Sequence, residues 1–294
     1  MRSNRPQSGE CLLPARHSER MTTFKVLLEY DGSRYSGWQD QKNARTVMGE
    51  LRKAAREVFR SDVEMQGAGR TDAGVHALGQ VAHVKVAVPV RHKPDVVKSR
   101  LNDLLPADIV VLEVSQVDRS FHARHDAVSR IYRYQISNRK QAFMKKYVWW
   151  VKEPLDLDLM NKAAAMLVGR HDFLCFRAED ASRPHEPTIV VVEGSEIEIE
   201  DDIITFRIEA SHFLWRMVRR IVGVLVRLGT HQINEQDFRK LLSGECAAAL
   251  DVAAWTAPAS GLFLEHVRYP ESPDGSLRKP ETRGHKARGY ERNE

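Results

Sequence analysis

Residues 62–88 read DVEMQGAGRTDAGVHALGQVAHVKVAV, and this stretch decides the fold. We expect a short strand at about 62–68, and alternating apolar side chains from Ala82 onward predict a second strand. The loop between them, residues 67–77, contains three glycines, which permit sharp bends and close backbone approach. The pattern predicts two strands joined by a loop that can present polar side chains into a cleft.

Strand and helix patterns continue on both sides of this loop. Apolar residues alternate over 24–30, which predicts a strand, and then follow helical spacing from a Thr46 cap to Val58. Pro94 suits the first turn of a second helix, and residues 109–112 form an apolar run typical of a buried strand. The order strand–helix–strand–strand–helix–strand is that of the split βαβ, or ferredoxin-like, arrangement.

The second half of the chain has nearly the same order. We expect strands at 130–137, 189–199, 203–209 and 262–268, helices at 155–168 and 213–228, and one extra helix near 235–242. The prediction is an α+β molecule with an N-terminal half at 22–118, which contains the glycine-rich loop, and a C-terminal half at 119–270. Two antiparallel sheets can then meet edge to edge, with helices outside and a central cleft between them.

Composition indicates a protein of the cell interior. The 294 residues are 42% hydrophobic, and no apolar run is long enough to cross a bilayer. Residues 1–21 and 271–294 are poor in apolar side chains, so we expect disordered tails and no secretory signal. Three distant cysteines indicate a reducing compartment without a disulfide framework, and a cytoplasmic location is expected. Part of the net charge of +5 lies in the tails, so bulk charge is weak evidence for nucleic-acid binding.

Asp72, inside the glycine-rich loop, is the candidate catalytic residue. Arg70 lies two residues earlier and permits a charge-assisted carboxylate–guanidinium pair, which keeps a carboxylate ionised, as a nucleophile must be. The alternative is an aspartate that only forms hydrogen bonds within its own turn, as many aspartates do. The loop by itself leaves both interpretations open.

Motifs along the whole chain resemble one family. The nonapeptide 69–77 resembles the signature loop of TruA-type pseudouridine synthases, and the resemblance runs in order from about Phe24 to Tyr269. It implies the pseudouridine synthase fold, with two ferredoxin-like (βαββαβ) halves. The other matching motifs are Tyr30-Asp31-Gly32, Gly37-Trp38-Gln39, Leu101-Asn102, Leu105-Pro106, Phe121-His122-Ala123-Arg124, Tyr132-Arg133-Tyr134, Gly169-Arg170-His171-Asp172-Phe173, Phe213-Leu214, Met217-Val218-Arg219, Ile221-Val222-Gly223 and Ala257-Pro258-Ala259-Ser260-Gly261-Leu262.

The resemblance implies an isomerase that converts uridine in RNA to pseudouridine. The bond from uracil N1 to the ribose breaks, the base turns, and it is rejoined through C5. Asp72 would be the nucleophile, attacking either C6 of the base or C1′ of the sugar. Arg70 would help to hold the opened stem, because a paired base must first be extruded. The substrate-binding residues further implied are Tyr132, which packs on the uracil and assists proton removal from C5, Arg219 near the aspartate, and Leu262 on the apolar side of the pocket.

The resemblance also implies a substrate and an assembly. The expected substrate is the anticodon stem-loop of tRNA, at tRNA positions 38 to 40, and the expected assembly is a homodimer. No metal, no small-molecule cofactor and no membrane are expected as partners. Met48 stands where family members often have a glutamine, and the segment 175–188 also departs from the family pattern. These departures put in doubt which RNA is modified.

The supporting side chains have structural alternatives. Tyr132 and Leu262 could be core residues, since aromatic and aliphatic residues on strands mostly pack. The predicted helix at 213–228 has a stripe of arginines that could be a solvated face or a phosphate-binding face; these are Arg216, Arg220 and Arg227.

The histidines raise the question of a metal site. His122 and His125 are three residues apart, but no nearby cysteine pair or acidic partner completes a zinc set. We expect instead that His76 and His122 form hydrogen bonds within the cleft.

Two other classes of function compete with the synthase interpretation. An RNA-binding protein without catalysis could use two ferredoxin-like halves as a docking surface, but the intact Arg70-Thr71-Asp72 argues against it. A glycoside hydrolase-like enzyme would require a second carboxylate placed for acid–base chemistry. Asp31 and Asp172 lie in other matched motifs and are the carboxylates to examine.

Overall fold

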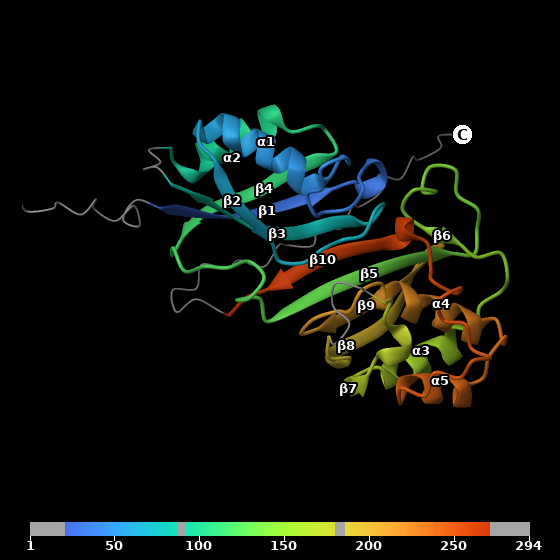
Figure 1. Cartoon of the computed structure of the whole chain (residues 1–294). Coiled ribbons are helices and arrows are strands. Elements are labelled where there is room, and N and C mark those ends of the chain that lie inside the picture. Colours follow the sequence, from blue (N-terminus) through green and yellow to red (C-terminus); the bar gives the residue numbers. More distant parts are fainter. Residues whose placement is uncertain (1–20, 88–91, 180–185, 271–294) are drawn as a thin grey trace, which may run out of the picture.

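The computed structural model describes residues 21–87, 92–179 and 186–270 (Figure 1). Except for Met21, the two expected disordered tails lie outside the described residues, so their disorder remains a prediction. Within the described ranges the molecule is an α+β protein, as expected from the sequence.

The predicted βαββαβ order is confirmed in both halves. The strands are β1 (Thr22–Tyr30), β2 (Val63–Gly67), β3 (His76–Val86), β4 (Ile109–Val117), β5 (Ser129–Ser137), β6 (Trp149–Trp150), β7 (Gly169–Asp172), β8 (Ile189–Glu200), β9 (Ile203–Ala210) and β10 (Leu262–Arg268). The helices are α1 (Val47–Phe59), α2 (Pro94–Leu104), α3 (Leu157–Met166), α4 (Met217–Gly229) and α5 (Glu235–Leu242), with 3-10 turns η2 (Gly32–Arg34), η3 (Leu174–Phe176) and η4 (Ala259–Gly261). The short strands β6 and β7 and the 3-10 turns are additions to the predicted order.

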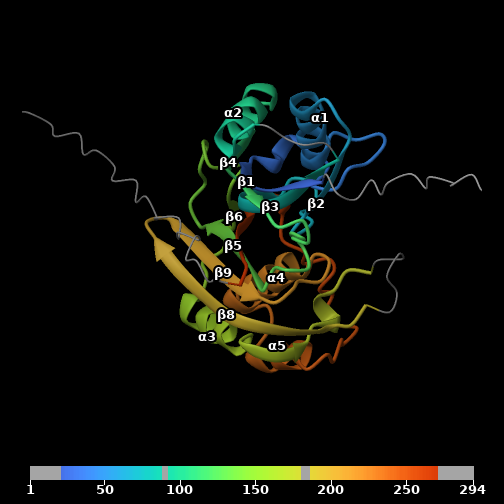
Figure 2. The ribbon, with the colours of Figure 1, turned by 90° about the vertical axis from the view of Figure 1, so that its left-hand side faces the viewer.

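The described strands form one continuous sheet. Its main path is β4-β1-β3-β10-β5-β9-β8-β7, with β2 paired to β3 and β6 paired to β5. The N-terminal half has the spatial order β4-β1-β3-β2, and the C-terminal half has the equivalent order β10-β5-β9-β8. Neighbouring strands within each half are antiparallel. The two sheets therefore meet edge to edge, as predicted. Figure 2 shows α1 and α2 on one side of the molecule and α3, α4 and α5 on the other, with the strands between them.

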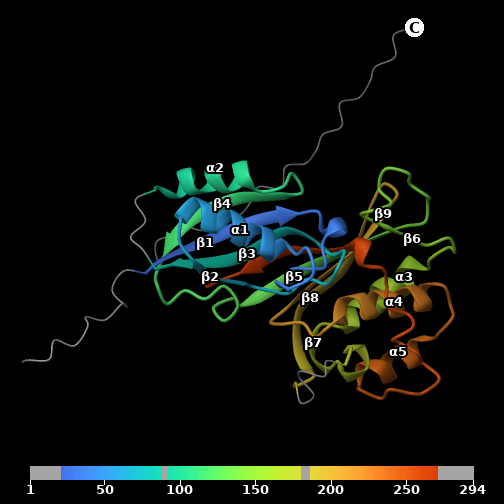
Figure 3. The ribbon, with the colours of Figure 1, turned by 45° about the horizontal axis from the view of Figure 1, so that its top comes forward.

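The junction between the halves is a short parallel pairing of β3 with β10. Residues 76–77 of β3 pair with residues 263–264 of β10, whereas residues 82–86 of β3 pair with β2. Gly79 lies between these two pairings, and a Cβ on it would lie 2.5 Å from the carbonyl oxygen of Glu265. Only glycine allows this close approach. The loop from β2 to β3 consequently emerges where the two halves meet. In Figure 3, β10 and β5 run between the two groups of helices.

Helices α1 and α4 are stabilised by the burial of their apolar side chains and by local features of their sequence. Helix α1 buries an apolar stripe against the sheet and begins at Thr46, whose hydroxyl accepts a hydrogen bond from the Gly49 N–H at 3.2 Å. Helix α4 is buried along most of its length. A Cβ on its Gly223 would lie 1.8 Å from the carbonyl oxygen of Trp255, so this glycine lets the chain before β10 cross the helix closely.

The start of α4 differs from the prediction. The spacing predicts a helix from Phe213, but α4 begins at Met217, and Arg216 before it has a left-handed backbone with φ of 58°. Residues 213–214 are irregular and 215–216 form a turn, because this conformation interrupts the helical ladder. The apolar spacing is the same in the turn and in the helix, so it could not reveal the break. The turn brings Phe213 and Trp215 to the central cavity described below.

The expectation that the cysteines form no disulfide is wrong for two of them. Cys175 in η3 and Cys246 in the loop after α5 are bonded, with a Cα–Cα distance of 5.3 Å. They are 71 residues apart in sequence. Only the packing of η3 against α4 and α5 brings them together, and no local pattern reports it.

Candidate active site

One cavity of about 830 Å³ lies where the two halves meet, and it is lined by residues of both. A volume of this size is within the range of small-molecule pockets, roughly 300–1,000 Å³, and leaves room for a nucleoside. The cavity brings together every residue proposed from the sequence as catalytic or substrate-binding: Arg70, Asp72, Tyr132, Arg219 and Leu262. They come from the loop after β2, strand β5, helix α4 and the start of β10.

The Asp72 carboxylate accepts one hydrogen bond on each oxygen. The indole Nε1 of Trp215 donates to Oδ1 at 3.1 Å, and the Arg219 guanidinium donates to Oδ2 at 3.3 Å. Arg219 is fixed in turn, because its Nε donates to the carbonyl oxygen of Ala257 at 2.7 Å. The guanidinium that pairs with Asp72 is thus that of Arg219. The pair with Arg70 that the sequence permits does not form between these two described residues, and Arg70 is exposed.

The turn around Asp72 is held by backbone bonds and leaves the carboxylate free to face the cavity. The carbonyl oxygen of Asp72 accepts from the Val75 N–H at 3.1 Å, and Gly74 between them has a φ of 79°, which favours glycine. Both carboxylate partners, at 143 and 147 positions from Asp72, belong to the other half of the chain. The side chain therefore does not act as a partner of its own turn, the alternative that the sequence left open.

Buried side chains fix the rest of this loop from beneath. The Gln80 amide forms two hydrogen bonds with the backbone of Gly69, donating to its oxygen at 3.1 Å and accepting from its N–H at 3.4 Å. The hydroxyls of Tyr30 and Thr71 are 2.8 Å apart, and Thr71 O accepts from the Trp38 N–H at 3.0 Å. These bonds order the backbone on the N-terminal side of Asp72, so the carboxylate is presented from a rigid support.

Tyr132 is a buried residue that lies beside this loop and lines the cavity. Its ring packs edge-on against Phe213, with centroids 5.0 Å apart, and a Cβ on Gly69 would lie 3.6 Å from its hydroxyl. Burial, together with the negative charge of Asp72 and the neighbouring Tyr30, raises the pKa of Tyr132 well above its usual value. The hydroxyl is therefore neutral at physiological pH and offers a proton donor beside the carboxylate.

Comparison with known proteins identifies the family. A family model described as tRNA pseudouridine synthase matches residues 26–126 and 163–270. A tRNA pseudouridine synthase A of a Thermoanaerobacter species is 41% identical over 253 residues, covering 85% of this chain and 100% of that protein. Proteins of the same name from a Thermotoga species and from Dictyoglomus thermophilum are each 39% identical over 251 residues, with the same coverage. The chain belongs to the tRNA pseudouridine synthase family.

The predicted enzyme class, an RNA pseudouridine synthase and hence an isomerase, is confirmed by this membership. The pseudouridine synthase fold expected from the motifs is confirmed as well. None of the helices that the structure describes is long and apolar enough to cross a membrane.

Arg130 is a residue of the synthase cavity that the sequence analysis missed. Its guanidinium donates to four carbonyl oxygens, those of Ala68, Arg124, Ala127 and Ser211, at 2.6–3.3 Å. Burial lowers the pKa of Arg130, but a guanidinium stays charged. It joins the glycine-rich loop to segments of the C-terminal half. The sequence does contain a signal for this role. Arg130 lies two residues before Tyr132, on the same buried face of the strand, and a buried arginine requires several hydrogen-bond acceptors.

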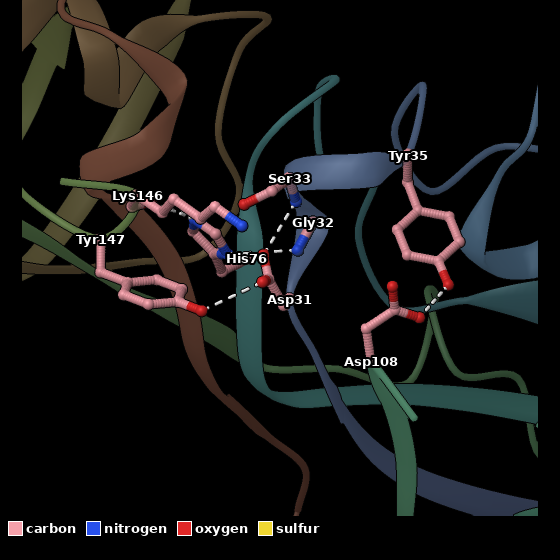
Figure 4. Close-up of polar contacts among 8 residues, drawn as sticks. All are labelled: Asp31, Gly32, Ser33, Tyr35, His76, Asp108, Lys146 and Tyr147. Atoms are coloured by element: carbon pink, nitrogen blue, oxygen red, sulfur yellow. Dashed lines mark hydrogen bonds and ion pairs between the residues drawn. The ribbon is translucent and has the colours of Figure 1, made fainter. Parts of the chain in front are cut away.

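His76 lies outside the cavity, contrary to the expectation that it faces the cleft. Its Nδ1 accepts from the Gly32 N–H at 3.1 Å, and its Nε2 donates to the Lys146 carbonyl oxygen at 3.0 Å (Figure 4). Burial lowers the pKa of His76 although the Asp31 carboxylate, 3.2 Å away, opposes this shift. The neutral imidazole thus connects η2 with the loop between β5 and β6.

His122 also has a structural role rather than one in the cleft. Its Nδ1 accepts from the N–H groups of Arg124 and His125, both at 3.2 Å, and closes a turn. Within the described ranges, no group of three or more histidine, cysteine, aspartate or glutamate side chains is placed to hold a metal ion.

The three arginines of the predicted basic stripe have separate surroundings. Arg216 lines the cavity of the synthase, and its guanidinium carbon lies 5.0 Å from the centre of the Trp215 ring. Arg220 donates to the Arg177 carbonyl oxygen, and Arg227 donates to Gln232. Of the three, Arg216 alone lines the cavity, so the stripe does not face the cavity as a unit.

The two carboxylates that the sequence offered for the glycoside hydrolase alternative, Asp31 and Asp172, do not line the cavity. Each accepts a backbone hydrogen bond from two residues further along, Asp31 from Ser33 and Asp172 from Leu174. Glu186 is the cavity's other carboxylate and was not considered from the sequence.

Proposed function

We propose that this synthase isomerises uridine in the anticodon stem-loop of tRNA and that Asp72 is the nucleophile. The observation that carries the proposal is the position of the Asp72 carboxylate. It lies on the wall of a nucleoside-sized cavity and accepts hydrogen bonds from the other half of the molecule, with none to its own turn. A guanidinium and an indole N–H that each donate to one oxygen orient the carboxylate, which a nucleophile requires.

The isomerisation is balanced within the substrate. The N1–C1′ bond breaks, the base turns in the cavity, and a C5–C1′ bond forms. The proton on C5 is lost, and N1 gains one. Asp72 would form a transient bond to either C6 or C1′ and is released unchanged. A target within a stem must first be extruded, at a cost of a few kcal/mol of unstacking.

The other cavity residues have distinct proposed roles. Arg219 holds Oδ2 of Asp72, and Tyr132 supports the uracil ring from the floor of the cavity. Because burial raises the pKa of Tyr132, its ionised form is costly, so its hydroxyl serves more as a hydrogen-bonding group than as a free base for the C5 proton. Leu262 provides apolar contact, and the exposed Arg70 is placed to hold the opened strand.

The substrate, assembly and location are part of the same proposal. The relatives are named for tRNA, and the lining of the cavity includes Arg70, Arg124 and Arg216, which suits a polyanionic substrate. The anticodon stem-loop and the homodimer rest on the family resemblance, and the cytoplasmic location rests on the composition of the chain. Sedimentation of the purified protein tests the dimer, and a monomer at micromolar concentration contradicts it.

The Asp72→Asn variant tests the nucleophile. We expect turnover to fall by about 10⁴-fold or more, because replacing a nucleophile removes the covalent step. Affinity for tRNA should change by less than about threefold, since phosphate contacts supply most of the binding. Tritium release from tRNA labelled at uracil C5 reports the reaction, and filter binding reports affinity. Normal release by the variant would exclude Asp72 from the mechanism.

A further inference from the structure

Trp215 is the second hydrogen-bond donor to the proposed nucleophile, and no sequence motif singled it out. Its indole Nε1 lies 3.1 Å from Oδ1 of Asp72. The residue is 42% exposed, in the turn between β9 and α4, and it lines the cavity. A large aromatic side chain left this exposed contributes little to the core, so its placement calls for an explanation at the site.

The backbone of Trp215 is anchored, and this anchoring positions the indole ring. The Trp215 carbonyl oxygen accepts from the Ala178 N–H at 2.9 Å, and the flanking Leu214 and Met217 are buried. The guanidinium of Arg216 covers part of the ring, at 5.0 Å from its centre, and the left-handed backbone of Arg216 ends the turn. The ring is therefore oriented by its own segment, without a pocket that encloses it.

Two hydrogen-bond donors, one on each oxygen, fix the orientation of the Asp72 carboxylate, which a single donor does not. With Arg219 alone, the carboxylate of Asp72 could still swing about its Cβ–Cγ bond. With Trp215 on Oδ1 and Arg219 on Oδ2, the plane of the carboxylate is set by one short segment of the C-terminal half, residues 215–219. Each oxygen keeps a lone pair for the substrate, since each accepts one hydrogen bond.

We infer that Trp215 is a positioning residue for the isomerisation, and that its indole N–H fixes the orientation in which Asp72 meets the uridine. This inference rests on the proposed function of Asp72. Trp215 acts through the carboxylate and needs no contact with the tRNA. Reactions depend steeply on such orientation, because small misplacements of a reacting group cost one to two orders of magnitude in rate, about 10–100-fold.

Trp215→Phe and Trp215→His separate the N–H from the aromatic ring. Phenylalanine keeps an aromatic face without a donor, whereas the imidazole of histidine can superpose on the five-membered ring of the indole, with Nε2–H in the place of Nε1–H. We expect Trp215→Phe to lower kcat by about 10–100-fold and to change KM for tRNA by less than about threefold. Trp215→His should recover kcat to within about threefold of the original enzyme at a pH where the imidazole is neutral.

The measurements on Trp215→Phe and Trp215→His can contradict the inference in three ways. Equal losses of kcat in both variants, or an unchanged kcat in Trp215→Phe, would overturn the inference. A rise in KM with an unchanged kcat would assign Trp215 to tRNA stacking and would overturn it too. Measuring Asp72→Asn in the same assay separates this inference from the proposed function. An inactive Asp72→Asn with a fully active Trp215→Phe removes the role of Trp215 alone, whereas an active Asp72→Asn removes the proposed function.

Discussion

Asp31 and Asp72 are two aspartates of matched motifs with nearly the same side-chain exposure, 28% and 27%. Asp31 accepts from the backbone of Ser33, two residues away, and from the Tyr147 hydroxyl at 3.0 Å (Figure 4). Asp72 accepts from two side chains of the opposite half and faces the cavity. Burial does not distinguish a structural aspartate from a candidate nucleophile here. What separates the two is that Asp31 accepts from its own turn, whereas both donors to Asp72 belong to the opposite half and Asp72 lines the cavity.

The largest effect is expected when the charged donor of the Asp72 pair is removed. Arg219→Met keeps the aliphatic contacts of the side chain but leaves Oδ2 unpaired, and we expect kcat to fall by about 10²–10³-fold, as for other donors at reacting centres. The matched control is Tyr147→Phe, which removes a donor from Asp31. Its kcat should stay within about twofold of the original, because Tyr147 does not line the cavity. A normal kcat in Arg219→Met with a raised KM would move Arg219 from the nucleophile to the tRNA backbone.

A smaller effect is expected on stability from Asp31→Asn. Burial alone raises the pKa of Asp31, but hydrogen bonds from Ser33 and Tyr147, with His76 nearby, outweigh burial and lower it. A lowered pKa in the folded state stabilises the protein above the unfolded value, about 4, and that contribution is lost as the pH falls through the folded value. We expect Asp31→Asn to lower the free energy of unfolding by about 1–2 kcal/mol at pH 7.

Urea unfolding of both proteins at pH 7 and below pH 4 checks the Asp31 prediction. The difference in stability should narrow in acid, while tritium release at pH 7 stays near the original rate. A rate that falls as far as in Asp72→Asn would remove the distinction between the two aspartates.

The smallest effect is expected at Tyr132. Tyr132→Phe keeps the ring that packs against Phe213 and loses only the hydroxyl, so we expect a loss of kcat below about tenfold. Tyr132→Ala removes the floor of the cavity and should cost considerably more. Tritium release by the two variants makes the comparison. Equal losses would show that the hydroxyl, rather than the ring, carries the role of this residue.

Elements with a regular period were predictable from the sequence. Helix α5 was predicted at about residues 235–242 and spans those residues, and both βαββαβ halves follow from apolar spacing. The five proposed site residues were also found together, because their motifs match a family throughout the chain. Their roles remain predictions.

Features that depend on contacts between distant segments could not be predicted. Local spacing offered Arg70 as the partner of Asp72, and only the family resemblance placed Arg219, which forms the pair, near the aspartate. The Cys175–Cys246 bond joins two segments 71 residues apart. The role of Trp215 could not be predicted, because the apolar spacing of the helix extends over Trp215 although α4 begins only at Met217. A sequence pattern records which face of an element is buried, but it does not record which residue of another element meets that face.

Pseudouridine mapping in tRNA tests the central claim most directly. Cells without this protein are supplied with the original chain, with Asp72→Asn or with Asp31→Asn, and their tRNA is mapped at single-nucleotide resolution. We predict that the original chain and Asp31→Asn restore pseudouridine in the anticodon stem-loop and that Asp72→Asn restores none. Restoration by Asp72→Asn at the level of the original chain would contradict the account.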